Sequence, residues 1–317
     1  MKILITGYAG FIGYHVCKKL IERGDELVGI DNLNTFYDHQ IKRNRHKKLE
    51  GKISGYEHSI LDIGSIDKIF DEDIDAVIHL AAYAGVRTSL ENPALYWFTN
   101  VIGTLNIIEL CKKNGIKNMV NVSSSSVYGE NAVAAERGLR EDEMAAWPVS
   151  PYASSKRAAE LMCENANQHF GMNISSLRFF TVYGPEQRPD LAIYKFVKAG
   201  IEGTKIQVYD NYDTRRDYTY VEDIADGIIA TMEYNKQNKG TVFNLGGGYP
   251  ISMRNLIDDI EDELDTVLDK ELIGAQPGDV RYTWADITRA RNLLNWEPKT
   301  NFSTGIKKFI SWARSSL

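Results

Sequence analysis

Tyr152, Lys156 and Ser124 are the residues of this 317-residue chain whose types and spacing best suit acid–base chemistry. Tyr152 and Lys156 stand four residues apart at the start of an expected helix, so their side chains share one helix face. An ammonium beside a phenol favours the phenolate and lowers a pKa that is ordinarily about 10. Tyr152 can then serve as a base near neutral pH. The strand-end hydroxyl of Ser124 can align the group that reacts.

A glycine-rich turn near the start of the chain is the second chemical feature. The apolar segment Ile3–Ile5 leads into Thr6-Gly7-Tyr8-Ala9-Gly10-Phe11-Ile12-Gly13 and an expected helix. Glycines at this spacing allow a tight turn, backbone approach to a pyrophosphate and close packing of helix on strand. A second strand ends at Asp31, eighteen residues past Gly13, where a carboxylate can bind both ribose hydroxyls and repel a 2′-phosphate. The pattern predicts NAD rather than NADP.

Further cofactor contacts are expected where later strands end. Asp62 and Ile63 follow the third strand and could reach the adenine, whereas His79 at the end of the fourth is expected to be a core residue. Asn100, within a helix, is either a surface amide or a polar group that serves the site. The expected cofactor-binding residues are Gly7, Gly10, Phe11, Ile12, Gly13, Asp31, Asn32, Asp62, Ile63, Leu80, Ala81, Ala82, Asn100, Tyr152 and Lys156.

The scaffold that positions these residues is expected to alternate strands with helices. Short apolar segments are expected to be strands at Lys2–Thr6, Glu26–Ile30, Gly55–Ser59, Ala76–Leu80, Met119–Ser123 and Ile174–Arg178. Helical patterns between them include Phe11–Arg23, Pro93–Asn114 and Pro151–Phe170. Alternation of this kind predicts an α/β fold: a Rossmann-type, doubly wound parallel sheet covered by helices on both faces.

The pattern changes after about Arg178, where segments shorten and Pro and Gly become frequent. We therefore expect an NAD-binding Rossmann domain over residues 1–179 and a smaller, interleaved C-terminal α/β substrate domain over 180–317. Residues 217–245, with a helix at Val221–Tyr234 and a strand at Thr241–Leu245, are expected to return to the main sheet.

Composition excludes some classes of protein. The formal net charge of −6 disfavours a nucleic-acid partner, and the basic run Lys42–Lys48 is interpreted as a solvated helix face. Three cysteines, each in an expected helix, fit a reduced cytoplasm better than a disulfide framework. No signal peptide and no apolar run long enough for a membrane span are recognised. The six histidines are scattered without ligand spacing, so no metal site is expected.

The Thr-Gly-x-x-Gly-x-x-Gly start and the Ser124, Tyr152 and Lys156 set resemble the extended short-chain dehydrogenase/reductase family over nearly the whole chain. Within that family the chain is most similar to nucleotide-sugar 4-epimerases, especially those that act on UDP-glucuronate. The resemblance implies that Tyr152 is the acid/base, Lys156 its cation and Ser124 the hydroxyl partner. It also implies an NAD that is retained between turnovers, and a homodimer formed through helices Pro93–Asn114 and Pro151–Phe170.

Three segments resemble the uronate branch: residues 31–38, 178–190 and 276–280. Thr181 stands where neutral-sugar epimerases usually carry Asn, and Gln276 where they often carry Arg. An anionic carboxylate needs fixed donors, ideally a guanidinium, and Arg188 could supply it or merely anchor its own loop. Arg216 matches the family's diphosphate-binding arginine, with a surface ion pair as the alternative. The expected substrate-binding residues are Arg87, Ser125, Ser126, Thr181, Arg188, Arg216, Gln276 and Asp279.

The reaction that the resemblance implies is C4 epimerisation of UDP-glucuronate to UDP-galacturonate through a 4-keto sugar. UDP-glucose 4-epimerase is the main alternative. Related 4,6-dehydratases carry an Asp-Glu pair where this chain has Ser125 and Ser126, and glucuronate decarboxylases usually carry Glu at the position of Ser126. A non-catalytic NAD-binding module is a hypothesis from a different class, which the intact Tyr152 and Lys156 pair disfavours.

Overall fold

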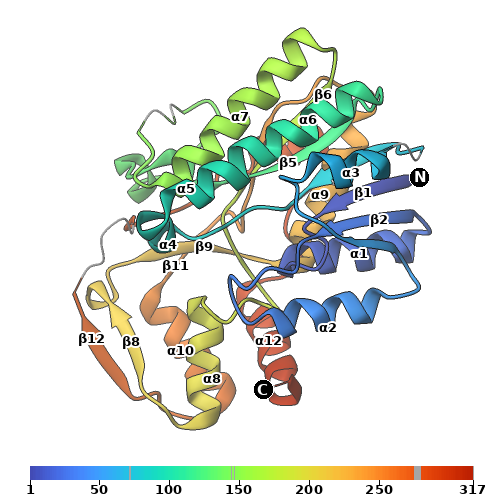
Figure 1. The fold of residues 1–317 in the computed structure, drawn as a ribbon. Coiled ribbons are helices and arrows are strands. Elements are labelled where there is room, and N and C mark those ends of the chain that lie inside the picture. The colour runs from blue at the N-terminus through green and yellow to red at the C-terminus, as the bar shows by residue number, and fades with distance from the viewer. Residues whose placement is uncertain (71–72, 144, 146, 275–279, 317) are drawn as a thin grey trace.

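The fold is built on a seven-stranded parallel sheet (Figure 1). The computed structural model describes residues 1–70, 73–143, 145, 147–274 and 280–316. Buried apolar runs form the central strands, as expected for a sheet covered on both faces. In spatial order the strands are β10 (Val242–Leu245), β6 (Asn173–Phe179), β5 (Asn118–Ser124), β4 (Ala76–His79), β1 (Lys2–Thr6), β2 (Glu26–Asp31) and β3 (Ser54–Glu57).

The strand order reverses at β1, which lies between β2 and β4. This is the switch point of a doubly wound sheet, where ligands bind outside the carboxyl ends of the strands. The order confirms the predicted Rossmann-type fold. Every predicted strand of the first 180 residues forms, with ends shifted by no more than two residues.

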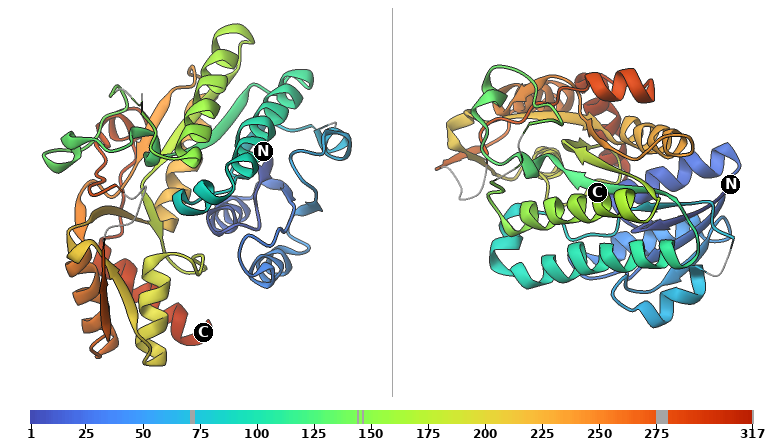
Figure 2. Two further views of the ribbon diagram at one scale, coloured as in Figure 1. Left: turned by 60° about the vertical axis from the view of Figure 1, so that its left-hand side comes forward. Right: turned by 90° about the horizontal axis from the view of Figure 1, so that it is seen from above.

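Helices pack on both faces of the sheet (Figure 2). One face is covered by α1 (Phe11–Arg23) and α9 (Val221–Asn235), which contact each other and the central strands. The other is covered by α3 (Ile63–Phe70), α6 (Gly103–Lys113) and α7 (Pro151–His169). Each face has its own cluster of buried apolar side chains. α2 (His39–Leu49) follows β2.

The helix expected over Pro93–Asn114 is not uniform. It consists of α5 (Pro93–Tyr96), a π-helical turn η1 (Trp97–Ile102) and α6. π-turns within α-helices often lie at functional sites. Pro93–Lys113 is also long and apolar enough, by length and composition, to cross a membrane, contrary to the sequence-based expectation. However, 56% of the apolar window is buried inside the fold, as in a core helix.

The C-terminal part has its own small sheets and core. β7 (Thr181–Tyr183), β9 (Arg215–Tyr220) and β11 (Pro250–Ser252) form one sheet, and β8 (Ile206–Tyr209) pairs with β12 (Lys270–Ile273). Three helices enclose a third apolar cluster beside them: α8 (Ala192–Glu202), α10 (Met253–Leu264) and α12 (Phe302–Ser316). Two further short α-helices are α4 (Val86–Glu91) and α11 (Thr288–Leu294). The 3-10 helical turns are η2 (Ser125–Tyr128), η3 (Ala132–Ala135) and η4 (Asp210–Tyr212).

The chain leaves the main sheet after β6 and rejoins it at β10. Residues 217–220 belong to β9 in the smaller sheet, so the return to the main sheet begins at α9 and not at residue 217. The buried Asp217 carboxylate links β9 to two later segments, because it accepts the N–H groups of Gly248 at 3.1 Å and Ala285 at 3.0 Å. β10 then joins the edge of the sheet beside β6.

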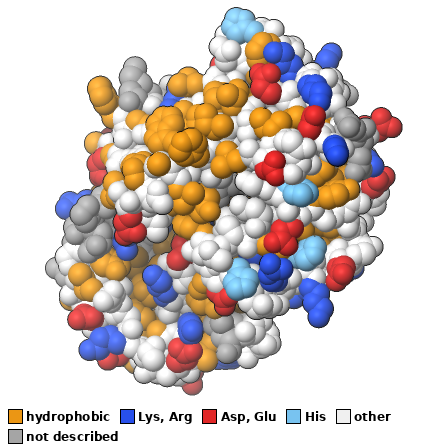
Figure 3. Space-filling view, viewed as in Figure 1, with side chains coloured by type: hydrophobic (Ala, Val, Ile, Leu, Met, Phe, Trp, Pro, Cys, Tyr) orange, Lys and Arg blue, Asp and Glu red, His pale blue; other side chains and the backbone are white. Residues whose placement is uncertain are grey.

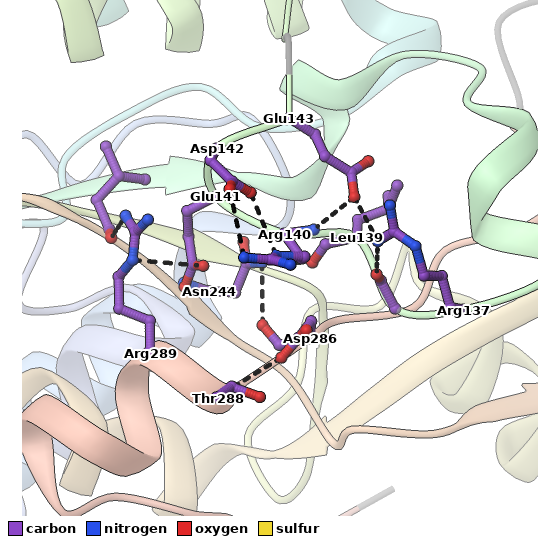
Figure 4. A network of polar contacts seen from close by, with 12 residues as sticks. Arg137, Leu139, Arg140, Glu141, Asp142, Glu143, Asn244, Asp286, Thr288 and Arg289 are labelled. Carbon is purple, nitrogen blue, oxygen red and sulfur yellow. Dashed lines mark hydrogen bonds and ion pairs between the residues drawn. The ribbon is translucent and has the colours of Figure 1, made fainter.

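A polar network fastens the loop after η3 to the end of this sheet (Figure 4). Asn244 on β10 donates its backbone N–H to Glu141 Oε1 at 2.9 Å and its amide Nδ2 to the Leu139 carbonyl at 2.8 Å. Leu139 also exchanges backbone hydrogen bonds with Trp284 and Asp286 at 2.7 and 2.9 Å. The network joins segments far apart in the sequence and holds residues 139–143, which precede α7, against the edge of the sheet.

Candidate active site

The glycine-rich turn between β1 and α1 lies at the switch point of the sheet. Gly7 has a φ of +74°, and a Cβ there would come within 2.8 Å of the Ala81 nitrogen. A Cβ on Gly13 would lie 2.2 Å from the Gly7 carbonyl oxygen. Side chains are therefore excluded at Gly7 and Gly13, which leaves the backbone of the turn and the N-terminus of α1 open to a pyrophosphate.

A cavity of about 450 Å³ extends from this turn across the carboxyl ends of the strands. It is lined by most of the expected cofactor, catalytic and substrate residues, which come from six segments of the sequence. Those that line it are Gly7, Gly10, Phe11, Ile12, Gly13, Asp31, Asn32, Leu80, Ala81, Ala82, Ser124, Ser125, Ser126, Tyr152, Lys156, Thr181 and Arg188. The fold thus brings residues of the predicted cofactor, catalytic and substrate sets together in one cavity.

Asp31, the last residue of β2, lines the cavity. It is buried and accepts the backbone N–H of Leu33 at 2.9 Å, and Lys42 Nζ lies 4.0 Å from its Oδ1. Burial raises the pKa of Asp31, while the Lys42 charge and the N–H groups of Leu33 and Ala9 oppose that rise. With its glycine cradle, the small Ala81 and this acceptor, the site fits a dinucleotide with a free 2′-hydroxyl.

The basic run on α2 differs from the sequence-based interpretation. Lys42 lines the cavity and donates to Asn34 Oδ1 at 2.9 Å, and Arg45 is completely buried, so the run is not simply a solvated helix face. Their spacing of three residues, which puts both on one helix face, was the available signal.

Tyr152 lies on the first turn of α7. The helix begins at Pro151, and the Ser150 hydroxyl caps it by accepting the Ala153 N–H at 3.1 Å. One turn later, Lys156 is buried and donates to the carbonyl of Val122 on β5 at 2.8 Å. Tyr152 and Lys156 both line the cavity. The cap at the start of α7 and the bond from Lys156 to β5 fix the positions of these two side chains relative to each other.

Ser124 is the last residue of β5 and lies beside Tyr152. It forms a hydrogen bond with the phenol. The Ser124 oxygen also accepts the Ser126 N–H at 3.2 Å and lies 3.1 Å from the Ser126 hydroxyl. These bonds hold Ser124 in a defined orientation beside Tyr152.

The pKa values at the site differ from the sequence-based expectation. Burial raises the pKa of Tyr152, while its hydrogen bond with Ser124 and the charge of Arg188 lower it. Burial also lowers the pKa of Lys156 to about 8. The protein alone therefore does not provide a permanently ionised phenol, and a further positive charge in the cavity would favour the phenolate.

Arg188 follows β7 and lines the same cavity. Its guanidinium forms a bidentate pair with Asp190, with nitrogen–oxygen distances of 3.0 and 2.8 Å. It also lies 5.6 Å from the ring centroid of Phe36, in the loop after β2. The guanidinium is thus fixed on the side of the cavity where its charge acts on Tyr152.

Four residues predicted at the site lie outside the lining of this cavity. Asp62 and Ile63 are exposed, and Asp62 Oδ1 instead accepts the Ser65 N–H at 3.3 Å at the start of α3. Arg87 stacks on the ring of Tyr209, 4.6 Å from its centroid. Arg216 Nη1 donates to the backbone carbonyls of Arg215 and Arg281 at 3.1 and 3.0 Å.

Asn100 also lies outside this lining and is buried. Its Oδ1 accepts the Tyr83 N–H at 2.8 Å, and its Nδ2 donates to the Tyr83 carbonyl at 2.9 Å and to the Ser155 hydroxyl at 3.0 Å. It therefore supports the site from behind by joining the loop after β4 to α7. Gln276 and Asp279 lie outside the described residues.

Aromatic and apolar lining residues were missed from the sequence. Phe36, Tyr83 and Phe180 line the cavity, directly or shortly after the ends of β2, β4 and β6. Ser59 and Ile60 line it in place of Asp62 and Ile63. Their position after parallel strands was the only sequence signal. His79, as predicted, is a core residue, whose Nδ1 lies 2.7 Å from the Thr6 hydroxyl.

Comparisons with known proteins agree with this geometry. Residues 3–246 match the model of the NAD dependent epimerase/dehydratase family. A protein of Thermodesulfobacterium geofontis named UDP-glucuronate 4-epimerase is 40% identical over 99% of this chain and 96% of its own. The crystal structure of UDP-glucuronic acid 4-epimerase from Bacillus cereus, in complex with UDP-glucuronic acid and NAD, is 33% identical and has a TM-score of 0.94, with 100% of both chains covered.

The fold is shared with an epimerase of a neutral sugar as well. A UDP-glucose 4-epimerase from Thermotoga maritima, solved with UDP-glucose, is 31% identical, covers 100% of this chain and 99% of its own, and has a TM-score of 0.91. Since the family model matches more than half of the sequence and the relatives span nearly all of it, this chain belongs to the NAD dependent epimerase/dehydratase family.

Proposed function

We propose that this protein interconverts UDP-glucuronate and UDP-galacturonate by epimerisation at C4, with NAD as its cofactor. The observation that carries the proposal is the meeting of three groups in one cavity. Tyr152 offers an acid/base group, Ser124 is hydrogen-bonded to it, and the Arg188 guanidinium is close enough to influence its pKa. This arrangement suits a sugar whose reacting hydroxyl and carboxylate are near each other.

The residues of the chain have separate roles in the proposed reaction. Tyr152 takes the proton of the C4 hydroxyl and later returns it, and Ser124 orients that hydroxyl. While Lys156 is protonated, its ammonium provides a positive charge near the Tyr152 phenol. NAD held by the glycine-rich turn and Asp31 would supply the acceptor and donor of the C4 hydride, and its positive charge would favour the phenolate. The 4-keto sugar exposes its other face before it is reduced, so the configuration at C4 inverts.

A uronate oxidised at C4 is a β-keto acid, which loses carbon dioxide readily. Arg188 can engage both carboxylate oxygens, and the hydroxyls of Ser125, Ser126 and Thr181 line the same cavity. These donors can hold the carboxylate away from the geometry that cleaves it. The absence of a carboxylate side chain at Ser125 and Ser126 favours epimerisation over elimination of water or decarboxylation.

The remaining substrate residues stay predictions. Arg216, Gln276 and Asp279 are expected on the diphosphate side, and Arg87 is a further candidate for substrate binding. Arg216 has one nitrogen bound to backbone carbonyls, and its guanidinium carries further donors that are able to bind phosphate.

We further propose a cytoplasmic homodimer. Exposed apolar side chains gather on α4, η1, α6 and α7, which supports pairing through these helices: Leu90, Trp97, Phe98, Ile102, Leu105 and Leu161. Hydrophobic side chains cluster over the same helices in the space-filling view (Figure 3). The three cysteines are buried and free, which fits a reducing compartment. Sedimentation equilibrium tests the dimer, which a Phe98→Glu variant should dissociate.

Product analysis tests the proposed reaction. We expect that incubation with UDP-glucuronate gives UDP-galacturonate in proton NMR spectra without added NAD, because the purified protein retains its cofactor. Formation of UDP-xylose or a 4-keto-pentose would assign the protein to the decarboxylases. Turnover of UDP-glucose but not of UDP-glucuronate would assign it to the neutral-sugar epimerases.

A further inference from the structure

Arg45 on α2 joins three segments that surround the cavity. Its side chain is completely buried. Nη1 donates to the carbonyl of Ala9 at 3.3 Å and to the hydroxyl of Tyr37 at 3.0 Å. Nη2 donates to the carbonyl of Glu186, and Nε lies 3.4 Å from the Glu186 carboxylate. One guanidinium therefore links the glycine-rich turn, the loop after β2 and the loop after β7.

The loop after β7 depends on such contacts for its shape. Glu186 has a φ of +65°, a conformation that costs free energy in a residue with a side chain. The Pro185 carbonyl lies 2.9 Å from His15 Nε2 on α1, and the Glu186 carboxylate also pairs with Lys48 on α2. Figure 2 shows this yellow-green loop beside the blue α2. The loop is thus attached to the cofactor-binding half from two helices.

Arg188 stands two residues beyond Glu186 and lines the cavity. The backbone geometry at Glu186 therefore sets where the Arg188 guanidinium lies. Phe36, which lies 5.6 Å from that guanidinium, precedes Tyr37, the second side chain that Arg45 holds. Arg45 supports Arg188 from its own loop and from the loop opposite.

We propose that Arg45 is a positioning residue that holds Arg188 in place against the cofactor-binding turn. Recognition of the sugar carboxylate then depends on Arg45, which does not itself line the cavity. The role of Arg188 in this inference rests on the proposed function, whereas the attachment of the loop does not. Arginine suits the position because its planar fork reaches four acceptors on three segments at once, which a lysine ammonium on a flexible stem cannot do.

Arg45→Lys tests the proposal, with Arg43→Lys as the matched control. Arg43 is on the same helix, its side chain is 48% exposed and its Nη2 lies 3.5 Å from the exposed Glu57. We expect faster amide hydrogen exchange over residues 184–191 in Arg45→Lys and wild-type exchange in Arg43→Lys. We also expect a KM for UDP-glucuronate raised about tenfold, the effect of losing roughly one hydrogen bond's worth of binding energy, with little change in kcat.

A purely structural role would give a different result. It would lower stability and raise exchange throughout the protein, and it would raise the KM for UDP-glucose as much as that for UDP-glucuronate. If Arg45→Lys does not fold, Glu186→Gln weakens the same attachment and should show the same localised exchange and selective KM change. Unchanged exchange over 184–191 in the folded variant would overturn the proposal, as would faster exchange with an unchanged KM.

Failure of the proposed function is a separate outcome. If the wild-type protein does not convert UDP-glucuronate, the assigned substrate is wrong, and the exchange measurement still decides whether Arg45 holds the loop.

Discussion

Glu160 and Arg178 form a buried bidentate ion pair. Arg178 Nε lies 2.9 Å from Glu160 Oε1, and Arg178 Nη2 lies 2.9 Å from Glu160 Oε2. Glu160 lies on α7 four residues after Lys156 and also accepts the Ser123 hydroxyl at 2.6 Å. The pair therefore ties the helix that carries Tyr152 to β5, which ends in Ser124, and to β6. It aligns the elements of the site without lining the cavity.

Removal of one partner should be costly. Glu160→Ala leaves the Arg178 guanidinium buried without its carboxylate, and we expect the free energy of unfolding to fall by about 3–5 kcal/mol. Urea denaturation measures the change. Glu164→Ala, an exposed position on the same helix, should change it by no more than about 0.5 kcal/mol. Equal changes in the free energy of unfolding for the two variants would show that the Glu160–Arg178 pair does not stabilise the fold more than an exposed residue does.

The same pair predicts a pH dependence of stability. Burial alone would raise the pKa of Glu160, but its hydrogen bonds and ion pair with Arg178 hold that pKa below its ordinary value. A depressed carboxyl pKa contributes stability above the unfolded value of about 4.3, and this contribution is lost as pH falls through the folded pKa. Urea denaturation between neutral and acid pH should show a steeper loss for wild type than for Glu160→Gln; parallel curves would refute the assignment.

Lys156 predicts the alkaline limit of activity. Burial lowers the pKa of this residue to about 8, so its ammonium is present below that pH and lost above it. Because the charge favours the Tyr152 phenolate, kcat should decline as pH rises through about 8. Lys156→Arg, which stays charged, should be slower overall but lack this decline. An unchanged alkaline decline in that variant would assign it to another group.

Arg188 predicts selectivity for the uronate. Arg188→Met removes a charged donor, so kcat/KM for UDP-glucuronate should fall by about 10- to 150-fold, the equivalent of roughly 1.5–3 kcal/mol. Turnover of UDP-glucose should fall less, because that sugar has no carboxylate and loses only the effect of the Arg188 charge on Tyr152. Arg314→Met, on the exposed last turn of α12, serves as the control. Equal losses with both sugars would mean that Arg188 only anchors its loop.

Residues that act through backbone spacing could be predicted from the sequence. The glycine-rich turn, Asp31 and the Tyr152/Lys156 pair each depend on a strand end or a helical repeat, and the structure places all of them in one cavity. The strands of the main sheet followed from apolar runs bounded by turns. Local patterns sufficed because each of these features is formed within one strand–turn–helix unit.

Features that depend on contacts between distant segments could not be predicted. In the sequence, Arg45 is interpreted as a surface residue within a basic run. The fold places it against Glu186, which is 141 residues away in the sequence. The sequence does not distinguish whether Asn100 is a surface amide or a polar group of the site, whereas the structure shows its amide within the π-turn η1, bound to the backbone of Tyr83. The sequence likewise did not indicate that residues 217–220 would pair with β7 and β11 rather than continue into the main sheet.

The central claim is that the hydrogen at C4 leaves the sugar as a hydride and returns to the opposite face, with Tyr152 handling only the hydroxyl proton. UDP-glucuronate deuterated at C4 tests this most directly when the product is analysed by NMR and mass spectrometry. We predict UDP-galacturonate that retains the deuterium at C4, and no turnover in Tyr152→Phe with NAD still bound. Replacement of that deuterium by solvent hydrogen, or full activity of Tyr152→Phe, would contradict the account.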